Sequence, residues 1–304
     1  MKPYLTVFGH VTIDQITSIP HFPALNETVD ILSKATSLGG TGANIAITAA
    51  RLGVPTALAA LVGTDLSHRY WDMLRNSGLI TDEIIPVDGY ETSSCIIMND
   101  TELRQKVIFY QGPQADITST GIDLSKNAMQ SERVHFCTGE PLYYINLAHK
   151  LREKGICVAG DPSQETYRRW KKENLLKLAA QSDIFFCNEY EARVIEERVG
   201  IPSIYELGPK IIVRTDGEEG SDALIDGEVV HIPTVKGNAQ VDATGCGDSY
   251  RAGFYSGLYH GYDIKESLIL ASSVASFVLE KTGALTNTPT WEMAEERAKG
   301  YMRD

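Results

Sequence analysis

The sequence predicts an α/β fold in which a doubly wound, mostly parallel sheet carries helices on both faces. Short apolar runs alternate with segments of helical periodicity, and most positions on both faces of these runs are apolar. Strands of this kind are buried on both faces, and parallel strands require crossover connections that are usually helical. From residue 245 onward the pattern is mainly helical. The length of 304 residues and the 43% hydrophobic content suit a single domain spanning residues 1–304.

The individual elements follow from the local pattern. A helix is expected at 42–52, where Ile45, Ala49 and Leu52 share one face, and another at 66–76. Asp226-Gly227 between two β-rich runs predicts a hairpin within 223–233. Buried strands are expected at 5–8, 57–62, 134–137, 156–159, 184–187 and 210–214.

Two stretches, 12–38 and 93–111, break the alternation. Each contains β-type residues without a helix, which predicts strands that leave the main sheet and form a small second one. Such a sheet beside a cleft acts as a lid that excludes water. The plainer alternative is a pair of edge hairpins without a role. An exposed small sheet also pairs readily with its own copy, which predicts a homodimer joined through the lid.

Composition excludes several classes of function. A net charge of −12 argues against nonspecific nucleic-acid binding, and no apolar run is long enough to predict a membrane span. The first residues resemble a core strand more than a signal peptide. The five cysteines are scattered, without a metal-binding spacing, so free thiols, a cytoplasmic location and no protein-held metal cluster are expected.

The segment 241–254 predicts phosphoryl transfer. Gly245-Cys246-Gly247 forms a small-residue turn whose backbone amides can converge on an anion, and the apolar helix that follows adds its positive end. Asp248 lies in the first turn of this helix, where it can accept a proton from an attacking hydroxyl. A helix N-cap with a glycine turn is the structural alternative. Arg251, one turn later, adds positive charge to the cradle or pairs with an acid.

A second glycine cluster occupies 39–46. Its glycines allow close approach to a ligand or tight helix–strand packing, and Asn44 offers a donor and an acceptor to a hydroxyl-rich ligand. The cluster lacks the third glycine of a dinucleotide fingerprint, and the chain has no Gly-Lys phosphate loop. Asp14, shortly after the first strand, can clamp two vicinal hydroxyls, although a lone aspartate at such a place is often simply solvated.

Two further motifs follow expected strands. Asn188 and Glu191, three residues apart, either hold water around Mg²⁺ near phosphates or cap a helix. The segment 215–220 contains Gly217 and Gly220 and fits a loop beneath a base or ribose, although a plain turn explains it equally well.

In this order, the motifs resemble those of the ribokinase or PfkB carbohydrate kinase family. The segment 39–44 is similar to the family's N-terminal signature, and 242–248 is similar to its C-terminal signature D-[TA]-x-G-[AC]-G-D. The resemblance covers essentially the whole chain. It is closest to archaeal-type nucleoside kinases, whose G-D-S-Y-R-A-G-F and T-N-x-P-T-W stretches correspond to 247–254 and 286–291.

The resemblance implies a role for each matching residue. Asp248 is the general base, and the amides of Gly245, Cys246 and Gly247 form the anion hole. Asn188 and Glu191 organise Mg²⁺ through water, and the family's cofactor is Mg²⁺ with ATP, with a monovalent cation left open. The implied nucleotide pocket contains Asn188, Thr215, Gly217, Gly220, Gly283 and Asn287. The implied sugar contacts are Asp14, Gly40, Gly42, Asn44 and Glu140.

Departures from the ribokinase pattern bear on the substrate. Cys246 replaces the usual alanine, which preserves the amide, whereas Thr41 and Thr12 replace a lysine and an asparagine and argue against ribose. Gln111, at the end of the lid segment, is expected to contact a nucleobase. The expected reaction is ATP-dependent phosphorylation of a nucleoside 5′-hydroxyl, in which a late proton transfer requires no large pKa shift at Asp248.

Two alternatives stay open. A sugar or phosphosugar kinase of the same family would act on ribose, fructose or a phosphosugar, and Arg104 is the only nearby lid cation for a sugar phosphate. The second alternative is a non-catalytic ligand sensor. The presence of Asp248 argues against it, because a sensor needs no general base.

Overall fold

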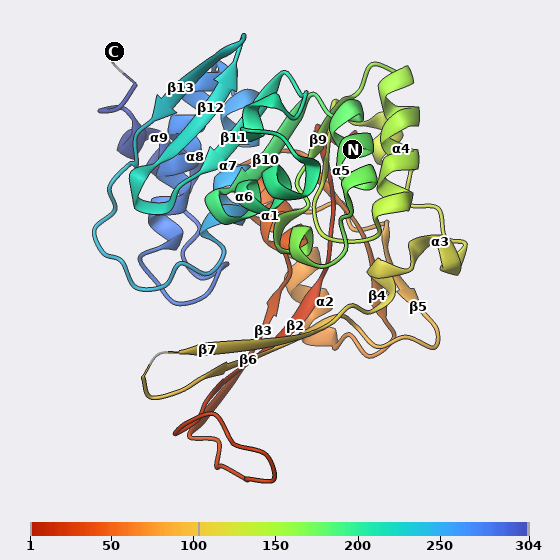
Figure 1. Cartoon of the computed structure of the whole chain (residues 1–304), viewed down its shortest axis with the longest axis vertical. Coiled ribbons are helices and arrows are strands. Elements are labelled where there is room, and N and C mark those ends of the chain that lie inside the picture. The colour runs from red at the N-terminus through yellow and green to blue at the C-terminus, as the bar shows by residue number, and fades with distance from the viewer. Residues whose placement is uncertain (1, 103, 303–304) are drawn as a thin grey trace.

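The computed structural model describes residues 2–102 and 104–302 and confirms the expected α/β class. One sheet has the strand order β13-β12-β11-β10-β9-β8-β1-β4-β5 (Figure 1). Its strands are β1 (Leu5–Phe8), β4 (Thr56–Gly63), β5 (Ile84–Val87), β8 (Arg133–Phe136), β9 (Cys157–Gly160), β10 (Ile184–Asn188), β11 (Ile211–Thr215), β12 (Ser221–Ile225) and β13 (Glu228–Ile232). The helices are α1 (Thr41–Arg51), α2 (His68–Arg75), α3 (Ile117–Thr120), α4 (Pro141–Glu153), α5 (Lys172–Gln181), α6 (Glu189–Val199), α7 (Cys246–Tyr259), α8 (Ile264–Val278) and α9 (Trp291–Ala298).

In this sheet the neighbouring strands β11, β10, β9, β8, β1, β4 and β5 are all parallel. Their carboxyl ends therefore meet at one edge of the sheet. The strand order reverses around β1, which pairs with β4 on one side and with β8 on the other. Ligands of doubly wound sheets bind outside the carboxyl ends of the strands at such a switch point. The expected hairpin is confirmed: β12 and β13 pair antiparallel around Asp226 and Gly227, both with positive φ.

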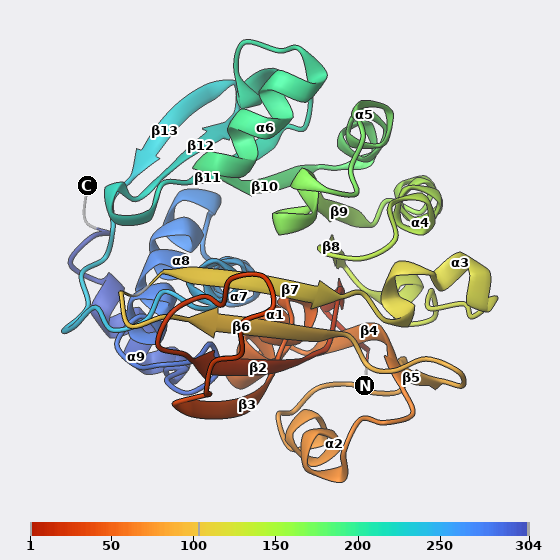
Figure 2. The ribbon, with the colours of Figure 1, turned by 60° about the horizontal axis from the view of Figure 1, so that its bottom comes forward.

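Helices cover both faces of the sheet, as the buried strands predict (Figure 2). Successive side chains of β4 point to opposite faces of the sheet, and both faces are buried. Leu58, Ala60 and Val62 belong to one hydrophobic core, and Ala59 and Leu61 belong to the other. The first core includes buried residues of α1, α2, α7 and α8, and the second includes those of α4, α5 and α6.

A second sheet of four strands, with the order β3-β2-β6-β7, confirms the interpretation of the two irregular stretches. Its strands are β2 (Thr12–Ser18), β3 (Ser33–Gly39), β6 (Ser94–Asn99) and β7 (Gln105–Tyr110), and they extend away from the body of the molecule (Figure 1). The chain passes from β1 into β2 within three residues and from β3 almost directly into α1. The base of the second sheet therefore lies at the carboxyl end of β1.

Strand β5 is the main element that the sequence pattern did not predict. It is four residues long and contains Pro86, which lacks an N–H group and is tolerated here because β5 is an edge strand. All five cysteines are free thiols. Over the described ranges, no helix is long and apolar enough to cross a membrane.

Candidate active site

The glycine cluster at the start of α1 is packed closely against the end of β1. Gly40 has φ of +97°, and a Cβ atom there would lie 2.4 Å from the His10 carbonyl oxygen. A Cβ atom on Gly42 would lie 2.6 Å from the backbone of Gly9. Tight packing, the structural alternative for these glycines, is therefore present. It brings the first turn of α1 to the switch point of the sheet.

The two signature segments meet through one hydrogen bond. The Asn44 side-chain amide in α1 donates to Asp248 Oδ2 in α7 over 2.8 Å, across 204 residues of sequence. Asn44 Oδ1 is buried and has no hydrogen-bond partner among the described residues. Asn44 therefore orients the Asp248 carboxylate and keeps an acceptor atom available to a ligand.

Asp14 lies close enough for its charge to raise the pKa of the Asp248 carboxylate. It stands in β2, where Thr12 Oγ1 donates to its Oδ1 atom over 2.6 Å, and burial raises its pKa. A Cβ atom on Gly39 would lie 2.1 Å from Asp14 Oδ2, so the glycine there makes room for this carboxylate. The structure thus brings Asp14, Asn44 and Asp248 together, as the sequence analysis expects.

Burial raises the pKa of Asp248 to about 6. The Asn44 hydrogen bond and the positive charge of Arg251 lower this pKa, whereas the charges of Asp161 and Asp14 raise it. A pKa near 6 differs from the sequence-based argument, which required no large shift. A general base with this pKa is ionised at neutral pH and more basic than an ordinary aspartate.

The loop before α7 is fixed by Asp242. Its Oδ1 atom accepts hydrogen bonds from the backbone N–H and Oγ1 of Thr244, and its Oδ2 atom accepts the N–H of Gly283 over 2.9 Å. Gly245 caps α7 with φ of +77°. The Cys246 N–H already donates to the Ala243 carbonyl over 3.1 Å.

The amides of Gly245 and Gly247 differ from that of Cys246. Neither makes a hydrogen bond to another residue of the described ranges, which leaves both free for an anion. The role of the three amides as an anion hole stays a prediction, and the Cys246 amide would have to be shared between Ala243 and the anion.

Asn188 and Glu191 form a reciprocal capping box at the start of α6. Asn188 Oδ1 accepts the Glu191 N–H over 2.8 Å, and Glu191 Oε2 accepts the Asn188 N–H over 2.9 Å. The capping alternative is therefore present. Glu191 is also buried, and burial, followed by the charge of Asp161, raises its pKa to about 7. Carboxylates that only cap a helix are ordinarily more exposed than Glu191. The role of Asn188 and Glu191 near Mg²⁺ stays a prediction.

The expected nucleotide-binding residues lie at the end of β10, at the end of β11 with the turn after it, and between α8 and α9. Thr215 pairs in register with Asn188 at the carboxyl ends of β11 and β10. Gly217 and Gly220 both have positive φ in the following turn. Gly283 is held by Asp242, and the Asn287 side-chain amide donates to the Phe277 carbonyl at the end of α8.

The Glu140 carboxylate is engaged within the described part of the protein, whereas the side-chain oxygen of Gln111 is not. The Gln111 carbonyl accepts hydrogen bonds from His10 Nε2 and Ser93 Oγ, while its side-chain Oε1 is buried without a partner among the described residues. Glu140 Oε2 accepts the Thr118 N–H at the start of α3, so this carboxylate is occupied by the protein itself. The proposed contacts of both residues with a substrate stay predictions.

Asp161 is the main site residue that sequence reasoning missed. It follows β9 directly, is buried, and accepts a hydrogen bond from Arg251 Nε over 2.8 Å. Gly160-Asp161-Pro162 after an apolar strand was the available signal, because polar residues at the carboxyl ends of parallel strands often lie at the site.

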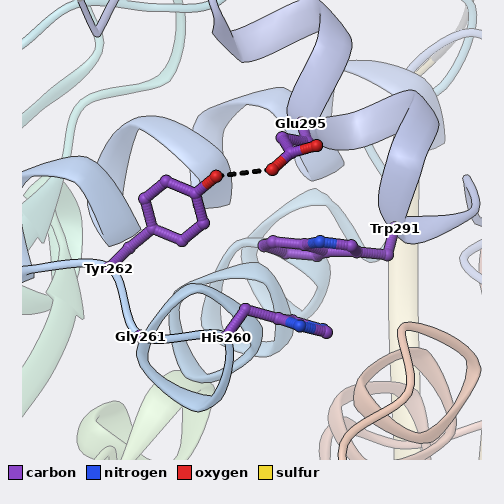
Figure 3. A pocket seen from close by; sticks show the side chains of 5 residues that line it. All are labelled: His260, Gly261, Tyr262, Trp291 and Glu295. Atoms are coloured by element: carbon purple, nitrogen blue, oxygen red, sulfur yellow. Dashed lines mark hydrogen bonds between the residues drawn. The ribbon is translucent and has the colours of Figure 1, made fainter.

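A surface pocket lies at the other end of α7 (Figure 3). It is lined by His260, Gly261, Tyr262, Trp291 and Glu295; the His260 ring stacks on Trp291 at 3.9 Å, and the Tyr262 hydroxyl donates to Glu295. Since α7 has 14 residues, this pocket is roughly 20 Å from Asp248. Its side chains pack α9 against the α7–α8 turn.

Similarity to known proteins agrees with this geometry. A nucleoside kinase of Methanothermobacter thermautotrophicus is 33% identical over 297 residues, which cover 96% of this chain and 94% of that protein. A ribokinase of Haemophilus influenzae is 25% identical over 302 residues, covering 95% of this chain and 96% of that protein. The crystal structure of Methanocaldococcus jannaschii nucleoside kinase superimposes with a TM-score of 0.90 at 29% identity and covers 99% of both chains.

The site and these similarities together define an ATP-dependent kinase with a hydroxyl acceptor. The chain belongs to the pfkB family of carbohydrate kinases, whose model matches residues 2–291.

Proposed function

We propose that this kinase transfers the γ-phosphoryl group of ATP to the 5′-hydroxyl of a nucleoside, with Asp248 as the general base. The contact between Asn44 and Asp248 supports the proposal, because it orients a carboxylate in the first turn of α7, the same turn in which the Gly247 amide has no hydrogen-bond partner among the described residues. The named nucleoside kinases that resemble this chain over nearly its full length support the nucleoside as acceptor.

The reaction needs little beyond positioning and charge. Asp248 accepts the proton of the 5′-hydroxyl as its oxygen bonds to the γ-phosphorus, and the bond from that phosphorus to the bridging oxygen of ADP breaks. The Gly245 and Gly247 amides and the positive end of α7 stabilise the transferred oxygens. Asp14 and Asn44 hold the sugar hydroxyls.

The residues present fit a magnesium ion that binds together with ATP. Mg²⁺ prefers oxygen ligands and usually binds through one or two carboxylates, water and substrate phosphates. Glu191 and Asn188 are oxygen donors of this type, and we place them there through water. Within the described ranges, no cluster of three or more His, Cys, Asp or Glu side chains could hold a metal alone. When bound, Mg²⁺ neutralises charge on the phosphates.

A substrate panel tests the acceptor. We expect ADP formation with nucleosides such as inosine or adenosine and little with ribose, fructose or fructose 6-phosphate. Arg104, the expected lid cation for a sugar phosphate, is held by Asp100 and Glu102 at the lid turn, which disfavours a phosphosugar. Preferred turnover of a free sugar would instead support the ribokinase-like alternative, and no ADP with any acceptor would contradict the proposal.

The pH dependence follows from the raised pKa of Asp248. The free enzyme needs the ionised carboxylate, so kcat/KM for the nucleoside should fall as the pH drops below about 6. Initial rates at saturating ATP between pH 5 and 8 measure this acid limb. An aspartate with an ordinary pKa would keep kcat/KM constant down to about pH 5, which would contradict the buried state of the base.

We also propose that the second sheet is both a lid and a dimer interface. Strand β7 is an edge strand, and Ile96, Ile108 and Tyr110 on one face of the sheet are 39, 58 and 46% exposed. Such an apolar edge favours pairing with a second copy. Light scattering should give a dimer for the wild type and a monomer for Ile108→Lys. A monomeric wild type would contradict the interface.

A further inference from the structure

A buried guanidinium lies beside the first turn of α7. Arg251 is 5% exposed, and its Nε donates to Asp161 Oδ2 over 2.8 Å. Its Nη1 donates to the Gly247 carbonyl over 3.3 Å, one helical turn back. The side chain also lies over the Phe186 ring at 5.4 Å. Arg251 therefore links the start of α7 to Asp161, which follows β9.

A second buried side chain, His135, lies next to Asp161. His135 Nε2 lies 3.4 Å from Asp161 Oδ2, and His135 Nδ1 forms a 2.8 Å hydrogen bond with the Tyr255 hydroxyl of α7. Asp161, His135 and Tyr255 are all buried. These contacts link β8 and β9 to α7 at Tyr255 and Arg251.

Asp161 is the acid in contact with this guanidinium, whose charge also acts on Asp248. Burial raises the pKa of Asp248, and the Arg251 charge lowers it. Burial alone would raise the pKa of Asp161 as well, but Arg251 and His135 lower it overall. Buried carboxylates without a compensating cation favour their neutral form. The other titratable groups near Asp248 are Asp14 of β2 and the thiols of Cys137 and Cys246.

We propose that Arg251 is a positioning residue for phosphoryl transfer: it ties the start of α7 to Asp161 at the end of β9, and its charge balances those of Asp161 and Asp248. The inference rests on the proposed role of Asp248 as the base. A neutral residue at 251 leaves Asp161 and Asp248 without their shared cation and removes the link between α7 and Asp161. Both changes weaken a base that must be ionised and in place before the acceptor hydroxyl can react.

Charge variants of opposite sign separate this role from simple packing. Arg251→Met removes the cation, so the acid limb of kcat/KM should move up by about one pH unit or more. Asp161→Asn removes a nearby negative charge, so the limb should move down. Arg251→Lys keeps the charge and should leave the limb close to wild type, while kcat falls on the order of tenfold because lysine cannot reproduce the guanidinium hydrogen bonds to Asp161 and Gly247.

Arg133 offers a matched control. It is a largely buried arginine of β8 that donates to the Tyr4 hydroxyl over 2.9 Å at the opposite end of the strand. Arg133→Met should lower the melting temperature without moving the acid limb. If Arg251→Met and Asp161→Asn shift the limb in the same direction, or neither shifts it, the charge-balancing role is overturned.

A titration that does not depend on turnover separates this inference from the proposed function. Carbon NMR of ¹³C-labelled aspartate, assigned with Asp248→Asn, follows the Asp248 carboxyl in each variant. Opposite shifts of its pKa in Arg251→Met and Asp161→Asn support the balance of charge even if no nucleoside is phosphorylated. If Arg251→Met does not fold, Asp161→Asn and Arg251→Lys decide: an Asp248 pKa that Asp161→Asn leaves unchanged overturns the proposal.

Discussion

Asp248→Asn is expected to lower kcat by about 10²–10⁴ while nucleoside and ATP binding stay nearly unchanged. Asparagine has the same shape, and its Oδ1 atom can still accept the hydrogen bond from Asn44 that Asp248 Oδ2 accepts in the wild type. It cannot take the proton of the attacking hydroxyl at neutral pH. Steady-state rates with ADP detection give kcat, and calorimetric titration gives the two dissociation constants.

The same variant should not lose stability. Burial raises the pKa of Asp248 from 3.8 to about 6, so the native state holds this proton to a higher pH than the unfolded chain. The contribution of Asp248 to the free energy of unfolding therefore falls as the pH rises from about 4 to 6, and Asp248→Asn removes that loss. At pH 7 its melting temperature should equal or exceed that of the wild type.

A surface carboxylate provides the control for this variant. Asp82 pairs with Lys126 and Asn127 away from the site, so Asp82→Asn should leave kcat unchanged. Full turnover by Asp248→Asn would remove this residue from the role of base. A large fall in its melting temperature would instead show that the carboxylate stabilises the fold.

Local patterns were sufficient to predict most of the architecture. Runs such as Phe185-Phe186-Cys187 are apolar on both faces of a strand, and this alone indicates a sheet covered on two sides. The second sheet was predictable because it breaks the alternation of strands and helices. The stretches around Ile16 and Ile96 have β-type residues without a following helix. Strand β5 was not predictable from its pattern because Pro86 interrupts a run of only four residues.

The arrangement inside the site depends on contacts between distant segments and was only partly predictable. A glycine-rich turn before an apolar helix identifies Asp248, but no local pattern shows that Asn44 reaches it from α1. The buried group of Asp161, His135 and Arg251 comes from three separate elements. The pKa of Asp248 depends on how deeply it is buried and on these neighbours, and both are properties of the assembled fold.

Gly245→Ala is expected to lower both activity and stability. Gly245 has φ of +77°, and a Cβ atom there would lie 2.3 Å from the Cβ of Ala284. The left-handed conformation costs roughly 1–2 kcal/mol for alanine, and the loop must also shift to relieve the contact. A displacement near 1 Å of groups that position a reaction can cost about 10² in rate. We therefore expect a comparable fall in kcat, measured with the nucleoside as acceptor.

Gly227→Ala separates the two contributions to this effect. Gly227 has φ of +86° in the β12–β13 turn, and a Cβ atom there would meet nothing within 4 Å. This variant incurs the conformational cost alone, so its free energy of unfolding should fall by roughly 1 kcal/mol with kcat unchanged. Gly245→Ala should lose more stability, because of Ala284, and most of its turnover. If it kept full turnover after losing that stability, the position of the amides at Gly245 and Gly247 would not limit the reaction, and the anion hole would have to be sought elsewhere.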